Sequence, residues 1–221
     1  MGIIYIVPMY KGIIIAALLL LIFLNSATLK ESFENMVLSK KVCNDIDGRC
    51  YNVSTKFGKE THASEKLAKI NKKIIDFLRY LRTKYIWCDY PENVDPYLRN
   101  VATRLLTLYS PDSIIENVPV GTVNTSYVED KGKVFALCLR EKRSGKNDFE
   151  NDDIVFFVTL HELTHIANES WGHDRSFWRD FKVLLHEAEK GGFYHPVNYQ
   201  NNPGDYCGLH VDYNPYYDSN I

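Results

Sequence analysis

His161-Glu162-Leu163-Thr164-His165 is the stretch from which the organisation of this chain can be worked out, and His173 follows eight positions after His165. On an α-helix, residues four apart project from the same face about one turn apart, so both imidazoles can reach one metal ion. Glu162 then lies beside that ion rather than on it, where a carboxylate can accept a proton from a water molecule. The pattern predicts the active-site helix of a zinc hydrolase.

The residues before the motif favour a buried helix. Asn151-Asp152-Asp153 offers an N-cap and acidic residues for the first turn, and the apolar run 154–160 leads into the motif. We expect this helix to extend from Asp152 to Ser170 and to lie in the core. The alternative is that His161 and His165 are structural histidines of such a helix, but Glu162 between them favours a metal site.

Length and composition favour one globular domain with an appendage. The chain has 221 residues, of which 45% are hydrophobic and 24% charged. The formal net charge of -2 at pH 7 gives no strong nucleic-acid signal. We expect a membrane anchor over residues 1–29, a juxtamembrane linker over 30–41, and a catalytic domain over 42–221.

The first segment is apolar without interruption from Gly12 to Leu24 and nearly so before Lys11. With its flanks it is long enough for one transmembrane helix, and Lys11 can extend toward the membrane surface. A signal peptide cleaved near Asn25-Ser26-Ala27 is the alternative. The sequence favours a retained single-pass anchor in a membrane. Lysines after the span slightly favour a cytosolic domain, whereas two glycosylation sequons, at Asn52 and Asn124, would be used only in the opposite orientation.

The rest of the chain alternates helical and strand-like patterns. The five cysteines lack CxxC spacing, and their odd count leaves at least one thiol free, while Cys43 and Cys50 flank a turn and could form a disulfide in an oxidising compartment. The expected elements are a hairpin over 43–53, helices over 62–85 and 96–110, strands over 120–128 and 133–140, a helix from about 175 to 190, and an irregular tail over 193–221.

A catalytic zinc ion needs three protein ligands and one open position. His173 is the best candidate for the third ligand because the chain turns back there, just after the motif helix. His186 on the following helix and His195 and His210 in the tail are the alternatives.

The run HELTHIANESWGHDRSFWRDF, residues 161–181, resembles the signature of WLM-type metallopeptidases, relatives of the SprT-like proteases, and is most similar to membrane-tethered versions from large DNA viruses. Softer matches lie outside the run, at Asp47-Gly48-Arg49, Lys131-Gly132, Cys138-Leu139-Arg140 and Tyr206-Cys207-Gly208. The resemblance implies an α+β, zincin-like domain with a small β-sheet beside the HExxH helix. It also implies that Zn²⁺ is held by His161, His165 and His173. It does not transfer a role in DNA repair, since no DNA-binding module is visible.

These observations predict a membrane-anchored zinc metallopeptidase that cleaves a protein or peptide substrate, with Glu162 as general base. The transition state also needs a donor for the oxyanion, and Tyr206 is the candidate because its family-like segment follows the metal helices. A catalytically silent interaction protein with the same fold is one alternative, and a zinc amidase acting on a non-peptide amide is another.

Overall fold

The computed structural model describes residues 38–89, 91–117, 125–141 and 148–221. Residues Ser39–Ile221 form one compact unit, and the sequence predicts a catalytic domain over 42–221 within it. Ser39–Cys43 forms β1, which takes up the end of the segment expected to be a linker. The domain is α+β.

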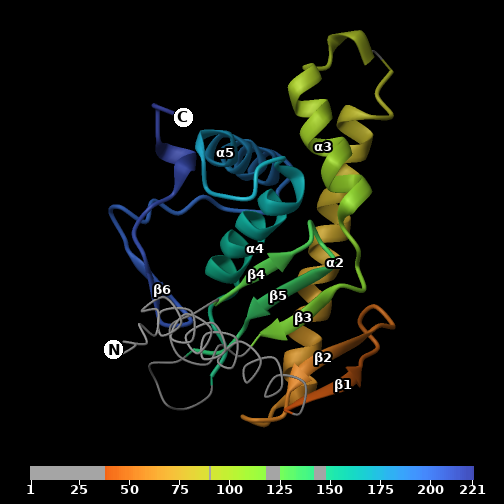
Figure 1. The fold of residues 1–221 in the computed structure, drawn as a ribbon, viewed down its shortest axis with the longest axis vertical. Coiled ribbons are helices and arrows are strands. Elements are labelled where there is room, and N and C mark those ends of the chain that lie inside the picture. Colours follow the sequence, from red (N-terminus) through yellow and green to blue (C-terminus); the bar gives the residue numbers. More distant parts are fainter. Residues whose placement is uncertain (1–37, 90, 118–124, 142–147) are drawn as a thin grey trace, which may run out of the picture. The chain divides into compact units, whose positions relative to one another are not determined.

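A three-stranded sheet lies at the centre of the described chain (Figure 1). Its strand order is β3 (Ile114–Asn117), β5 (Val134–Cys138) and β4 (Tyr127–Glu129). β3 is parallel to β5, whereas β4 is antiparallel to it. Phe135 to Cys138 are all buried, as expected for a strand without polar–apolar alternation.

A separate hairpin precedes the first long helix. β1 pairs with β2 (Cys50–Ser54) and places Cys43 opposite Cys50, and these two cysteines form a disulfide. The Asp47 carboxylate accepts the Arg49 backbone N–H, and Gly48 has a φ of 69°, which glycine adopts at low cost. The expected turn at Asp47-Gly48 is therefore present.

Helices α2 (Glu60–Tyr85) and α3 (Pro96–Leu108) pack against each other. α2 buries an apolar face that includes Leu67, Ile74 and Phe77, with lysines on the opposite side, as the periodicity predicts. Asp95 caps α3 by accepting the Tyr97 N–H at 2.8 Å.

α4 (Asp152–Ala167) contacts α3, α5, β4, β5 and β6, and most of its residues are buried. Asn151 caps it by accepting the Asp153 N–H at 2.8 Å. The helix ends at Ala167 rather than at Ser170 because Asn168 leaves the helical conformation, and its side chain accepts the Ser170 N–H.

α5 (Arg175–Lys190) follows after a short loop, and Asp174 caps it by accepting the Phe177 N–H at 3.0 Å. The chain then runs as ordered loop with a small hairpin of β6 (Gly204–Tyr206) and β7 (Leu209–Val211). Cys207 and Gly208 both have positive φ, as a two-residue hairpin turn requires. A disulfide joins Cys207 to Cys138 at the end of β5, and among the described cysteines Cys88 is the free one.

The predicted fold class needs correction. The sequence predicted an α+β zincin-like domain preceded by a transmembrane helix. No helix in the described part of the chain combines the length and apolar character needed to cross a membrane. The described fold is therefore α+β without a transmembrane helix. The segment Met1–Leu29, for which the transmembrane helix was predicted, lies outside the described residues.

Candidate metal centre

α4 places His161 and His165 one turn apart at the surface of an otherwise buried helix, with ring centroids 5.0 Å apart. His173 reaches the same place from the loop between α4 and α5. Its Nε2 atom lies 2.9 Å from His161 Nε2 and 3.1 Å from His165 Nε2. One ligand atom from each histidine thus lies within 4.8 Å of the other two, as a shared metal ion requires.

Phe177, which is fully buried on α5, contacts the imidazole rings of all three histidines. Its centroid lies 4.9 Å from that of His161, 4.4 Å from that of His165 and 4.6 Å from that of His173. Trp178 adds a second aromatic contact to His173, at 5.8 Å between centroids. Phe177 and Trp178 therefore pack against the three histidines and restrict the orientations of their imidazole rings.

The cluster also favours neutral imidazoles. Burial and then the neighbouring imidazoles lower the pKa of His161 to about 3. Burial, His173 and Lys131 lower the pKa of His165 to about 4, and burial lowers the pKa of His173. Neutral histidine is the form that binds a metal ion.

Glu162 lies next to the cluster and is 4% exposed. Its Oε2 atom is buried and has no hydrogen-bond partner within the described residues, and burial raises the pKa of this carboxyl to about 8. A buried carboxylate oxygen without a partner is costly. A water molecule or cation in the adjacent cavity would supply the missing partner.

A cavity of about 250 Å³ opens over these residues. The three histidines and Glu162 line it together with residues that the sequence did not single out as site residues: Ser126, Tyr127, Val128, Lys131 and Trp171. The first three come from β4 and the residue before it, while Trp171 is 73% exposed at the loop. The contact between β4 and α4 was not visible in the sequence pattern.

Tyr206 is not among the residues that line the cavity. Its side chain is 1% exposed, and its hydroxyl donates to the Cys138 carbonyl and shares a second hydrogen bond with Ser126 Oγ, both at 2.7 Å. Burial raises its pKa far above the usual value. The structure therefore places the Tyr206 hydroxyl in the interior behind Ser126, where it is still near enough to Glu162 for the two groups to interact electrostatically.

The alternative third ligands lie elsewhere. His186 packs against Tyr216 with ring centroids 4.2 Å apart, His210 lies 3.5 Å from the Asp205 carboxylate, and His195 is exposed in the tail. None of them joins the group of His161, His165 and His173.

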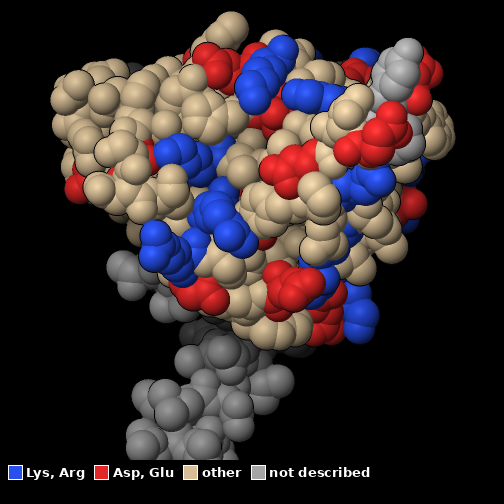
Figure 2. Space-filling view, turned by 90° about the horizontal axis from the view of Figure 1, so that it is seen from above, with Lys and Arg blue, Asp and Glu red and all other residues tan. Residues whose placement is uncertain are grey.

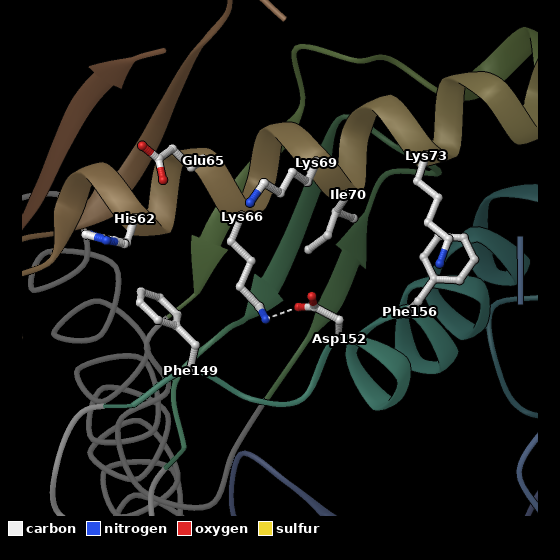
Figure 3. A pocket seen from close by; sticks show the side chains of 9 residues that line it. All are labelled: His62, Glu65, Lys66, Lys69, Ile70, Lys73, Phe149, Asp152 and Phe156. Carbon is white, nitrogen blue, oxygen red and sulfur yellow. Dashed lines mark hydrogen bonds and ion pairs between the residues drawn. The ribbon is translucent and has the colours of Figure 1, made fainter. Parts of the chain in front are cut away.

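A second hollow, of about 300 Å³, lies along α2 and shares no residue with the first (Figure 3). Lys66 crosses it to Asp152, and the Lys73 ammonium lies 3.8 Å from the centre of the Phe156 ring. These contacts join α2 to the start of α4. Elsewhere, basic and acidic side chains are interspersed on the face shown in Figure 2.

The fold and the histidine cluster define an α+β domain with a candidate three-histidine metal centre. The chain is 33% identical over 209 residues to the uncharacterized protein R325 of Acanthamoeba polyphaga mimivirus, a match that covers 91% of this chain and 93% of that protein. It belongs to the same family as this viral protein.

Two shorter matches are also viral. The uncharacterized protein 136R of Invertebrate iridescent virus 6 is 30% identical over 96 residues, which is 43% of this chain and 53% of that protein. The uncharacterized protein 042R of Invertebrate iridescent virus 3 is 32% identical over 84 residues, or 38% and 51% of the two chains. The matches thus cover about half of each iridescent virus protein. No protein-family profile matches the chain, and no solved structure matches it.

Proposed function

We propose that this chain is a zinc-dependent metallopeptidase that hydrolyses peptide bonds, with His161, His165 and His173 as metal ligands and Glu162 as general base. Its main support is the convergence of three imidazole Nε2 atoms beside a buried carboxylate. The likeness of residues 161–181 to WLM-type metallopeptidases points to the same chemistry.

The residues present fit a zinc ion. Two nitrogen ligands at about 2.0–2.1 Å from one tetrahedral ion lie about 3.3 Å from each other. The two nitrogen–nitrogen distances that involve His173, 2.9 and 3.1 Å, are close to this value, and all three nitrogen atoms lie within 4.8 Å of one another. Three histidines also leave one position free, which is the ligand set of a catalytic rather than a structural zinc site.

When bound, the ion would supply Lewis acidity, polarising a substrate carbonyl and lowering the pKa of a water molecule to about 7. Glu162 has a separate task. Its carboxylate accepts a proton from the attacking water as the oxygen–carbon bond forms, and it returns that proton to the departing amine as the carbon–nitrogen bond breaks. The water oxygen remains in the new carboxyl group.

The cavity walls suit an extended chain better than a small ligand. β4 on one side and the exposed Trp171 on another border an open depression of about 250 Å³. An extended peptide can pass through such a depression with one bond at the histidines. This favours a protein or peptide substrate over a compact non-peptide amide.

The test is to measure metal content and cleavage on the same preparations of the full-length chain. We expect about one zinc ion per chain in the wild type and in Glu162→Gln, whereas mass spectrometry of a peptide library should detect new termini with the wild type alone. Glu92→Gln, an exposed change between α2 and α3 that is remote from the cavity, is the matched control and should cleave normally. A chain that binds no zinc refutes the proposal, and one that binds zinc but cleaves nothing is the silent alternative.

A further inference from the structure

Lys131, in the turn between β4 and β5, makes an unusual set of contacts. Its Nζ atom donates to three backbone carbonyls, at 3.0 Å to His165, 2.7 Å to Asn168 and 2.5 Å to Ser170. We propose that Lys131 is a positioning residue that fixes the His173 loop against the end of α4 and so sets the geometry of the metal centre. This inference rests on the proposed function, since it concerns the same site.

The ammonium group is fully committed to these contacts. A lysine ammonium has three N–H donors and no acceptor, and here it has three carbonyl partners. Although Lys131 lines the cavity, it has no donor left for a substrate carbonyl or a carboxylate. Its contribution is therefore to the shape of the site rather than to binding or proton transfer.

The contacts link the two segments that carry metal ligands. The last carbonyls of a helix lack partners within the helix, and a positive charge at this end is favourable. Lys131 binds the carbonyl of one metal ligand, His165, and also that of Ser170, three residues before His173. The loop that follows α4 has no regular structure, and these bonds hold it in place.

Arg104 on α3 supports the same loop from another element but does not replace Lys131. Its guanidinium donates to the Ala167 carbonyl at 2.6 Å and to the Asn168 carbonyl at 3.2 Å. It has no such bond to His165 or Ser170 within the described contacts. Lys131 is thus the residue whose ammonium group connects the His165 carbonyl on α4 to the Ser170 carbonyl in the loop before His173.

The turn that carries Lys131 is itself constrained. Asp130, Lys131 and Gly132 have φ values of 46°, 55° and 112°, the first two being uncommon for non-glycine residues. A Cβ atom at Gly132 would lie 3.0 Å from the Leu108 carbonyl and 3.4 Å from Ile166 Cδ1, so the turn packs closely on α3 and α4. Trp171 covers the ammonium, which lies 4.8 Å from its ring centre. Strain retained beside a site is consistent with a positioning role.

Lys131→Met tests this role because methionine keeps a similar length without the three donors. We expect the dissociation constant for Zn²⁺, measured by chelator competition, to rise about 10–100-fold, the usual effect of removing an outer-shell contact. The visible absorption of the Co²⁺-substituted protein should also change. Lys133→Met is the matched control, since Lys133 is exposed in the same turn, pairs with Asp130, and does not line the cavity.

A double-mutant cycle shows whether Lys131 acts through His173. The change should have little further effect on zinc affinity in a His173→Ala background, whereas additive losses would contradict the inference. If Lys131→Met fails to fold, Lys131→Gln provides a smaller perturbation, for which we expect an intermediate loss of affinity. Wild-type zinc affinity and Co²⁺ absorption in these variants would refute the positioning role alone, whereas a wild type that binds no zinc would refute the proposed function as well.

Discussion

His161 Nε2 and His173 Nε2 lie 2.9 Å apart, although one belongs to α4 and the other to the exposed loop that follows. The helix would supply two of the proposed ligands from a rigid scaffold, and the loop would supply the third. The two kinds of ligand should therefore respond differently to mutation.

We expect His161→Ala and His165→Ala to abolish stoichiometric zinc binding. His173→Ala should leave a weak site, because the helical pair remains in place after the loop ligand is removed. Its loss of affinity should exceed the roughly 10–100-fold cost of outer-shell changes. Chelator competition measures all three variants, with His186→Ala as the control. An unchanged zinc affinity in His173→Ala would show that His173 is not a ligand.

Two tyrosines near the site should have separable effects. Tyr127 lines the cavity, so we expect Tyr127→Ala to raise KM for a peptide substrate by roughly tenfold, the effect of about 1.4 kcal/mol of lost binding, with zinc content unchanged. Tyr206→Phe should instead lower the free energy of unfolding by about 1–3 kcal/mol, because it leaves the buried Cys138 carbonyl without this donor. Steady-state kinetics and urea unfolding on both variants check this. The reverse pattern would support the catalytic role that the sequence predicts for Tyr206.

The two disulfides should contribute unequally to stability. Cys138–Cys207 closes a sequence separation of 69 residues and Cys43–Cys50 one of 7. In the chain-entropy description the longer loop gives about 4 kcal/mol and the shorter about 2 kcal/mol. Urea unfolding of Cys138→Ala/Cys207→Ala and Cys43→Ala/Cys50→Ala should show the larger loss in the first pair. Cys88→Ser is the control, and it should unfold like the wild type.

Glu187 should make stability depend on acid pH. Burial opposes its ionisation, but hydrogen bonds from Lys84, Tyr85 and Lys190 outweigh burial and hold the pKa of Glu187 below its usual value. A carboxyl with a lowered folded-state pKa stabilises the fold above its unfolded pKa, and this contribution is lost as pH falls through the lower folded value. The difference in unfolding free energy between wild type and Glu187→Gln should thus shrink below about pH 4. A constant difference from pH 3 to 7 would contradict this assignment.

Local sequence patterns were sufficient to predict the bounds of most helices. The cap at Asn151, the apolar run that follows and the cap at Asp174 place α4 and α5 within a few residues of their observed bounds. β3 was missed because its pattern includes the polar pair Glu116 and Asn117. Both side chains are buried in the structure. Glu116 can be buried because its carboxylate accepts a hydrogen bond from Arg140 at 2.6 Å and one from the Ser54 backbone N–H at 2.8 Å.

Contacts between segments far apart in the chain could not be predicted from local sequence patterns. The motif identified His161 and His165 and favoured His173 over three other histidines, and the structure brings these three together. The resemblance implied a small sheet beside the HExxH helix, but no residue pattern indicated which strand would line the cavity or that Lys131 would reach three carbonyls 34 to 39 residues away. The pairing of Cys138 with Cys207 and the interior position of Tyr206 likewise depend on how the tail returns to β5.

The burial of α4 also determines how zinc would enter and leave. α4 is capped by Asn151, contacts α3, α5 and three strands, and is buried along most of its length. We therefore expect the amide hydrogens around Leu163 to exchange with solvent mainly through global unfolding, with or without metal. Unlike a zinc finger, whose chain orders only around its ion, this domain would gain or lose the ion by ligand exchange at a site that is already formed.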